Sequence, residues 1–141
     1  MSDFENFAPM VFAELDPDVP YDSQLRSGYT GEVTLIGTYV FKSDAALEGF
    51  LKTFPAHADF MRSKPGFQSA QLHRGIAGAK VLIICANWDS PAAFHAAFAE
   101  EEAALARLQS PNAEGDKAAA AAITARRVLV ERLFENYGPI A

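Results

Sequence analysis

One stretch decides the fold: FMRSKPGFQSAQLHRGIAGAKVLIICANWDSPAAFHAAF, from Phe60 to Phe98, which contains in turn a helix end, a hairpin and a helix start. Pro65-Gly66 is predicted to end the first helix. A strand is predicted over Phe67–Arg74, and Gly75–Gly78 then supplies turn residues that tolerate positive φ. The second strand of the hairpin is predicted over Lys80–Trp88.

Two helices are predicted, one on each side of this hairpin. Ser43 is expected to cap the first helix, in which apolar residues recur at spacings of three and four. These residues are Leu47, Phe50, Leu51, Phe54, Ala58 and Met61. Pro55 is expected to interrupt this helix, either as a kink or as the start of a second short helix at Ala56, and to leave irregular backbone near His57. The second helix starts after Ser90, with Pro91 at a first position whose N–H needs no intrahelical partner.

Two further strands complete the predicted domain. Alternation predicts a buried strand over Glu32–Phe41, and a long final strand is predicted over Arg126–Tyr137, after a loop and short helix in Ser110–Ala122. The order β-α-β-β-α-β indicates an α+β, ferredoxin-like split βαβ domain with an antiparallel sheet. Its two helices cover only one sheet face. Because the strands are too apolar for the other face to meet water, we expect a homodimer that closes into a dimeric α/β barrel.

The first 31 residues differ from the rest. Three prolines, Pro9, Pro17 and Pro20, preclude a continuous helix there, yet the segment also carries aromatic residues. We therefore expect residues 1–31 to form an extended arm that packs on its own domain, residues 32–141, or on a partner subunit. If the arm covered the bare sheet face within one subunit, no dimer would be needed.

Composition bounds the possible functions. The chain has 141 residues, half of them apolar, which suits one compact domain. The longest apolar run, Val81–Ala86, is far too short to span a membrane, and the N-terminus lacks the pattern of a signal peptide, so a cytoplasmic protein is expected. A net charge of −6 without a basic cluster argues against nucleic acid and anionic membranes as partners.

The sequence also lacks the usual signatures of cofactor sites. Cys85 is the single cysteine, so no internal disulfide is possible, and a buried inert thiol is expected there. The three histidines show no metal-ligand spacing, and no nucleotide-binding or serine-hydrolase motif occurs. We expect neither a metal nor another cofactor.

Several short motifs carry a resemblance to a known family. They are Phe60-Met61-Arg62 before Pro65-Gly66-Phe67, then Leu72-His73-Arg74, then Asn87-Trp88-Asp89-Ser90 followed by Phe94 and Phe98. With these motifs, Glu32–Tyr137 resembles the antibiotic biosynthesis monooxygenase superfamily. This superfamily contains dimeric α/β-barrel proteins, among them cofactor-independent quinone-forming oxygenases and haem-degrading enzymes.

The resemblance implies a chemistry and a place for it. In the oxygenases, a phenol or anthrone reduces O₂ itself after deprotonation, so the protein must supply an apolar pocket, a proton acceptor and hydrogen-bond donors. Trp88 matches the tryptophan that the family places beside the ligand, although a large aromatic residue there could equally be plain core. The implied partners are a small apolar aromatic substrate and O₂.

The candidate site residues follow from these considerations. The catalytic candidates are Trp88, His73, Arg74 and His57, and the substrate-binding candidates are Tyr39, Phe54, Phe60, Asn87, Phe94 and Phe98. His73 and Arg74 are neighbours on a strand, so at most one of them should face the pocket. His57 is a candidate base beside Pro55.

Three positions depart from the family pattern. Ile84 stands where anthrone-oxidising members carry an asparagine, and Gly37 is the counterpart of an asparagine in haem-degrading members. Haem-degrading members also carry a ligating histidine on the second helix, at a spacing that His95 does not reproduce. The haem interpretation is therefore weakened most. The leading hypothesis is a cofactor-independent monooxygenase or related tailoring enzyme acting on a phenolic polycyclic substrate. A non-catalytic ligand-binding or assembly dimer and an aromatic polyketide cyclase stay open as alternatives.

Overall fold

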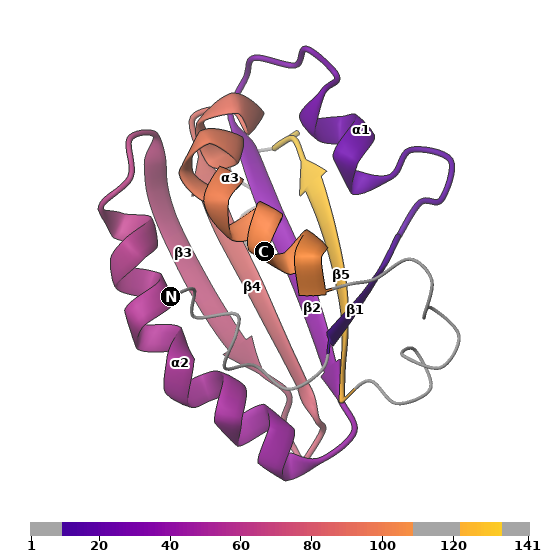
Figure 1. The fold of residues 1–141 in the computed structure, drawn as a ribbon. Helices are drawn as coiled ribbons and strands as arrows, with labels where there is room; N and C mark the ends of the chain where they lie inside the picture. Colours follow the sequence, from indigo (N-terminus) through magenta and orange to yellow (C-terminus); the bar gives the residue numbers. More distant parts are fainter. Residues whose placement is uncertain (1–9, 109–121, 134–141) are drawn as a thin grey trace, which may run out of the picture.

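The computed structural model describes residues 10–108 and 122–133, with side chains for 10–99 and 122–133. These residues form one five-stranded sheet in the order β1-β5-β2-β4-β3, with helices packed on it (Figure 1). The elements are β1 (Met10–Ala13), α1 (Tyr21–Leu25), β2 (Val33–Phe41), α2 (Asp44–Arg62), β3 (Phe67–Arg74), β4 (Val81–Trp88), α3 (Pro91–Leu108) and β5 (Ile123–Val130). The expected ferredoxin-like α+β architecture is therefore confirmed.

The central hairpin forms as predicted. β3 and β4 pair antiparallel, and the Gly75 N–H donates to the Val81 carbonyl at 2.9 Å to close the turn. The turn needs residues that accept left-handed backbone, since φ is +57° at Ala77 and +77° at Gly78.

Both predicted helix starts are confirmed. The Ser43 hydroxyl accepts from the Ala46 N–H at the start of α2, and the Ser90 hydroxyl accepts from the Ala93 N–H at the start of α3, both at 3.1 Å. Pro91 occupies the first position of α3. Each cap satisfies a backbone donor that the helix itself leaves unpaired.

Of the two possibilities at Pro55, the second short helix does not form, because α2 is one helix that contains this residue. A proline within a helix costs about 3 kcal/mol or more. The apolar stripe continues on both sides of it, with Phe50 buried before and Met61 buried after. We infer that packing of both halves on the sheet offsets this cost and keeps the helix continuous.

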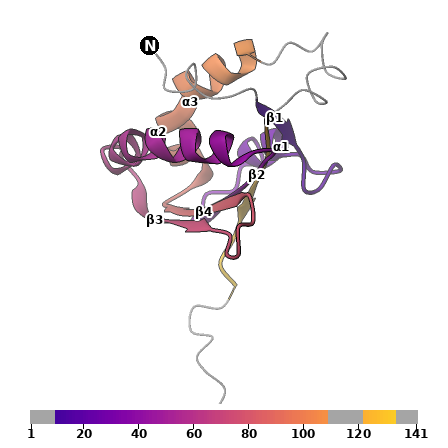
Figure 2. The same ribbon diagram turned by 90° about the horizontal axis from the view of Figure 1, so that it is seen from below.

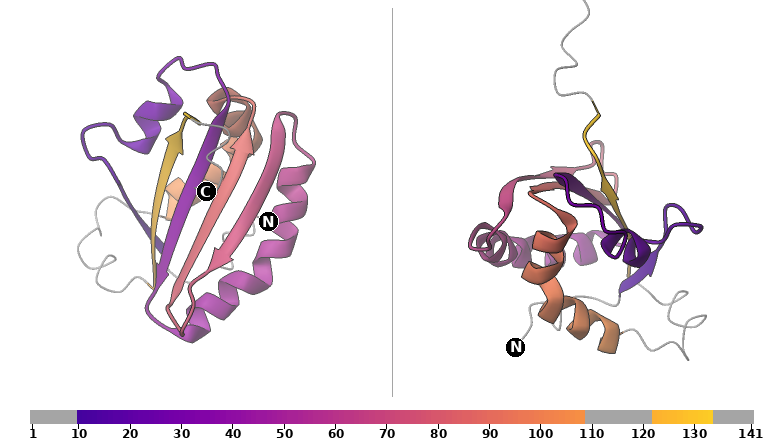
Figure 3. Two further views of the ribbon diagram at one scale, coloured as in Figure 1. Left: turned by 180° about the vertical axis from the view of Figure 1, so that it is seen from behind. Right: turned by 90° about the horizontal axis from the view of Figure 1, so that it is seen from above.

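The helices α2 and α3 lie on one face of the sheet, which we call the helix-covered face (Figure 2). β4 shows the consequence, since its residues alternate between buried and half-buried along the whole strand. Leu82, Ile84, Ala86 and Trp88 are buried beneath the helices. No helix of the described chain covers the other face, which we call the open face and which is seen directly in Figure 3 (left).

The segment before β2 differs from the expected extended arm, because it adds a strand and a helix to the domain. β1 pairs parallel with β5, and Tyr21 of α1 is buried in the core. Arg127 of β5 stacks on the rings of both Phe12 and Tyr21, at 4.2 Å from each centroid. The Gln24 side chain bonds both backbone groups of Leu129, at 2.8 and 3.0 Å. Residues 1–9 lie outside the described chain.

The final strand also differs from its predicted span of Arg126–Tyr137. β5 begins three residues earlier, at Ile123, which pairs with Phe41 and is buried. It ends at Val130, paired with Thr34 near the start of β2, and beyond this point β2 offers few further partners. The loop and short helix expected over Ser110–Ala122 fall outside the described residues except for Ala122.

Gly66 offers a test of how α2, β3 and α3 meet. Its φ is +87°, and a Cβ at this position would lie 2.5 Å from the Ala93 Cβ. We expect Gly66→Ala to lower the free energy of unfolding by about 2–4 kcal/mol, through left-handed strain and a steric clash together. Denaturant unfolding followed by circular dichroism measures this.

Gly28→Ala is the matched control. Gly28 has a similar φ of +85°, but a Cβ added there would have no heavy atom within 4 Å. Gly28→Ala should therefore lower the free energy of unfolding only through backbone strain, by about 1 kcal/mol. Equal destabilisation of the two variants would contradict the close packing of Gly66 on α3.

Candidate active site

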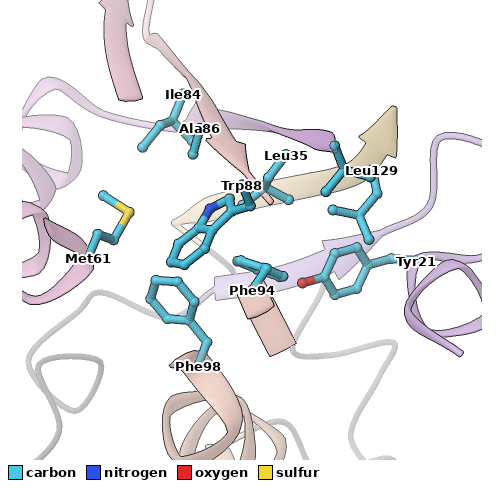
Figure 4. Packing of buried hydrophobic residues seen from close by; sticks show 10 residues of the cluster. Tyr21, Leu35, Met61, Ile84, Ala86, Trp88, Phe94, Phe98 and Leu129 are labelled. Carbon is cyan, nitrogen blue, oxygen red and sulfur yellow. The ribbon is translucent and has the colours of Figure 1, made fainter. Parts of the chain in front are cut away.

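Trp88, at the end of β4, is the centre of an aromatic cluster. It is 0% exposed and meets three phenylalanine rings edge-on: Phe67 at 5.3 Å, Phe94 at 5.6 Å and Phe98 at 5.8 Å between centroids. Figure 4 shows the indole lying over Phe94 and Phe98. Edge-to-face contacts of this kind add to the stabilisation that burial of the rings provides.

Local backbone structure explains why these rings converge. Phe67 pairs with Trp88 across the hairpin, next to a register shift between Phe67 and Ser69. The chain then turns into α3, whose cap at Ser90 fixes the first turn. Phe94 and Phe98 are one helical turn apart, so both face the indole.

The indole N–H of Trp88 is the one buried side-chain polar group in the described chain that has no hydrogen-bond partner. An unpaired buried donor costs about 1–3 kcal/mol. In Figure 4 the nitrogen lies on the side of the ring that faces Ala86 and away from Phe98. The N–H is therefore a buried donor without an acceptor among the described residues.

The helix α2 brings a histidine to the same cluster. His57 is half-buried, and its ring lies 5.4 Å from that of Phe98, 6.0 Å from Phe54 and 6.5 Å from Phe60. Phe60 and Phe98 are themselves 5.6 Å apart. Because Phe98 touches both Trp88 and His57, the structure joins the two candidates through one shared ring. We call these residues the Trp88 cluster: Phe54, His57, Phe60, Phe67, Trp88, Phe94 and Phe98.

Sequence reasoning missed two neighbours of Trp88. Met61 is buried in the same core, and Phe67 meets the indole directly. Both could have been found: Met61 lies one turn after His57 on the apolar stripe, and Phe67 begins the strand that pairs with the end of β4.

Tyr39 lies elsewhere on the helix-covered face. It is half-buried on β2, its ring is 4.9 Å from that of Phe50, and it packs against both groups of core residues. One group surrounds Trp88, and the other surrounds Leu47 and Leu82. Tyr39 therefore connects the Trp88 cluster with the opposite end of the core.

The structure places His73 and Asn87 outside the Trp88 cluster. His73 is exposed and stands beside Ile83 on the open face. Asn87 also points to the open face, where it accepts from the Thr34 hydroxyl at 2.6 Å and donates to the Ser69 hydroxyl at 2.9 Å. The cause is strand alternation, which directs residue 87 away from the face that holds Trp88.

Arg74 lies on the helix side but not in the cluster. Its guanidinium donates to the Glu48 carboxylate of α2 at 2.8 Å, with both side chains exposed. This position fits the expectation that His73 and Arg74 take opposite faces. His95 is exposed on α3.

A surface groove of about 340 Å³ lies near α1 and the end of β5. Its walls include Gln24, Tyr29 and Leu129, and none of its lining residues is a candidate from the sequence. Within residues 10–108 and 122–133, no group of histidine, cysteine and carboxylate side chains could hold a metal ion. None of the helices described is both long and apolar enough to cross a membrane.

Comparison with known proteins places this geometry in a family. Residues 33–109, more than half of the chain, match the family described as antibiotic biosynthesis monooxygenase. The chain belongs to this family. The resemblance seen in the sequence is thereby confirmed. A comparison with curated protein sequences gave no significant match.

Solved structures of antibiotic biosynthesis monooxygenase family members and similar proteins share the fold. A candidate monooxygenase from Shewanella loihica PV-4 is 30% identical, with 77% of this chain and 100% of that chain covered and a TM-score of 0.56. SnoaB, a cofactor-independent oxygenase from Streptomyces nogalater, is 21% identical over 77% and 99% of the two chains, with a TM-score of 0.52. A variant of MhuD with two manganese protoporphyrin IX molecules bound per active site is 24% identical over 75% and 99%, with a TM-score of 0.51.

Two of the three departures from the family pattern are neighbours in the sheet. Gly37 of β2 pairs directly with Ile84 of β4, and a Cβ on Gly37 would lie 3.1 Å from the Ile84 Cγ2. A larger side chain at position 37 would therefore have to displace the isoleucine. The sizes of the side chains at positions 37 and 84 therefore constrain each other.

Trp88 is the single tryptophan of the chain, so its fluorescence reports on the cluster alone. Because the indole is fully buried among apolar rings and its N–H is unpaired, we expect blue-shifted emission and weak quenching by acrylamide. Unfolding in guanidinium should shift the emission to the red and restore quenching. Emission of the native protein at the wavelength of free tryptophan would contradict the described packing.

Proposed function

We propose that this protein is a cofactor-independent monooxygenase that oxidises a phenolic polycyclic aromatic compound at the Trp88 cluster. The observation that carries the proposal is the buried, unpaired N–H of Trp88 inside an aromatic cluster that also holds a histidine. Aromatic walls with a few convergent polar groups are typical of sites for apolar aromatic ligands. Membership of a family described as monooxygenases supports the reaction class.

The proposed reaction converts a methylene carbon between two phenolic rings into a carbonyl. A base removes one proton from this carbon, and the resulting enolate transfers an electron to O₂. The radical pair combines to form a carbon–oxygen bond, and protonation gives a hydroperoxide. Loss of water then leaves the quinone, with one oxygen atom in the product and the other in water. The substrate supplies the electrons.

Two residues have defined roles in this proposal. His57 accepts the proton, because it is the histidine that the structure brings to the cluster and neutral imidazole is a suitable base. Trp88 donates its N–H to the substrate oxygen that gains negative charge as the enolate forms. A donor already placed in a water-poor site stabilises such charge without reorganisation.

A second candidate function has an observation in its favour. Ile84 is buried hydrocarbon at the position where anthrone-oxidising members carry an asparagine, and hydrocarbon cannot donate a hydrogen bond. A ligand-binding dimer without turnover, or a cyclase that needs an apolar pocket but no O₂, would tolerate this residue. Measurement of oxygen consumption separates these functions from the oxygenase.

The decisive experiment uses 1,8-dihydroxyanthrone as substrate, with an oxygen electrode and absorbance of the anthraquinone product. The wild-type protein should consume one O₂ per quinone formed, above the uncatalysed rate. His57→Gln should lower turnover about a hundredfold or more through loss of the base. Trp88→Phe should weaken transition-state stabilisation by about 1–3 kcal/mol through loss of the donor.

His95→Gln is the matched control, since His95 is an exposed histidine of α3. It should turn over the anthrone at the wild-type rate. Binding of the anthrone without oxygen uptake would favour the non-catalytic dimer. Equal effects of the two histidine variants would remove His57 from the proposed mechanism.

We also propose that two copies associate through the open face. Its central residues include the half-buried Ile36, Ile83 and Val128, and Val40 is 45% exposed. An apolar patch at the centre of a sheet face is typical of an interaction surface. A symmetric pair would bury the face of each copy against the other and complete the expected barrel.

Ile83→Lys tests this association, because it places a charge at the middle of the open face. We expect the wild-type protein to sediment as a dimer and the variant as a monomer at micromolar concentration. Ile76→Lys is the control: Ile76 is 87% exposed at the hairpin turn, and its replacement should leave the dimer intact. A monomeric wild-type protein would contradict the proposal.

A further inference from the structure

We propose that the hydroxyl of Tyr39 is a second ligand-binding group of the same site, and that Gly37 is the positioning residue that lets it lie there. The inference rests on the proposed function, since it concerns the same ligand. It adds a recognition point at the opposite end of the ligand from Trp88. The geometry around Gly37 carries the argument.

The ring of Tyr39 lies back along β2 over Gly37. A Cβ on Gly37 would be 3.2 Å from the Tyr39 Cε2 and 3.3 Å from its hydroxyl oxygen. The phenol therefore occupies the space that a side chain at position 37 would need. The Tyr39 hydroxyl therefore lies beside residue 37 of β2 rather than directly above residue 39.

The backbone does not explain why glycine occupies this position. Among the described glycines, φ is positive at Gly28, Gly66 and Gly78 but not at Gly37. Glycine within a strand is destabilising by roughly 0.5–1 kcal/mol relative to alanine, and it commonly marks a close approach of another group. Here that group is the Tyr39 ring.

The hydroxyl lies on the side of Tyr39 that faces the Trp88 half of the core. Gly37 pairs with Ile84, which belongs to the core residues around Trp88, whereas Tyr39 itself pairs with Leu82 of the other group. The Phe50 ring, 4.9 Å away, supports the Tyr39 ring from α2. On this face of β4, Ala86 is the one residue between Ile84 and Trp88.

The strand positions beneath the two polar groups are well separated. Ile84 and Trp88 are four residues apart on a strand, which corresponds to about 13 Å between their backbones. We therefore assign the Tyr39 hydroxyl and the Trp88 N–H to different oxygens of an extended ligand. A hydroxyl can donate one hydrogen bond and accept two, so Tyr39 can bind a ligand oxygen and keep another partner.

Two anthraquinones that differ at one end test this assignment. The first, 2,6-dihydroxyanthraquinone, carries a hydroxyl at both ends, and the second, 2-hydroxyanthraquinone, carries one. Quenching of Trp88 fluorescence measures the Kd of each without any turnover. The wild-type protein should bind the two-ended compound about tenfold more tightly.

Tyr39→Phe keeps the ring and removes the hydroxyl. It should raise the Kd of the two-ended compound about tenfold and leave that of the one-ended compound unchanged. Gly37→Ala should have the same effect by displacing the ring, and the double variant should show no further loss. This non-additivity distinguishes positioning through Tyr39 from a general effect on stability.

The outcomes separate the two proposals. If the wild-type protein binds both compounds but Tyr39→Phe keeps the preference for the two-ended one, the Tyr39 assignment is wrong and the proposed function stands. Additive effects of the two substitutions would remove Gly37 as a positioning residue. If neither compound quenches Trp88 in the wild-type protein, both proposals fall. Should Gly37→Ala fail to fold, the selective loss in Tyr39→Phe alone decides.

Discussion

The buried indole of Trp88 holds together the end of β4, the start of β3 and the first turns of α3. Burial of a large aromatic side chain stabilises the fold by roughly 1.5–3 kcal/mol, and a buried unpaired N–H destabilises it by about 1–3 kcal/mol. The two magnitudes are similar, so packing alone gives little reason for an indole where a phenylalanine ring would avoid the penalty. Under the proposed function, a ligand oxygen that accepts from the N–H would remove this penalty. The same residue thus connects the stability of the fold with the proposed chemistry.

Elements with strong local signals could be predicted from the sequence. The hairpin, both serine caps and the strand before α2 follow from glycine, proline and alternation patterns, and the structure agrees at these places. β1 and α1 were missed because four and five residues are too few to show periodicity. Their formation depends on contacts far along the chain, such as Arg127 with Phe12, which no local pattern encodes. No new helix starts after Pro55, because tertiary packing outweighs the local preference for a helix break there.

For the site, the sequence indicated residue types better than it indicated faces. Phe54, Phe94 and Phe98 could be named from helix spacing and His57 from its place beside Pro55, and the structure gathers them around Trp88. Asn87 was proposed with its neighbour Trp88, although adjacent strand residues point to opposite faces. The relation between Gly37, Ile84 and Tyr39 depends on the register of β2 against β4, which becomes visible only in three dimensions.

The parallel pairing of β1 with β5 has a practical consequence for anyone who shortens this protein to the start of its family match. The match to the family begins at residue 33, yet the folded unit reaches back at least to Met10. A fragment that begins at residue 33 and keeps β5 would leave the backbone of β5 unpaired along one side and remove both rings that stack on Arg127. An exposed strand of this kind invites pairing with other chains, so the shortened protein would be the one prone to aggregate.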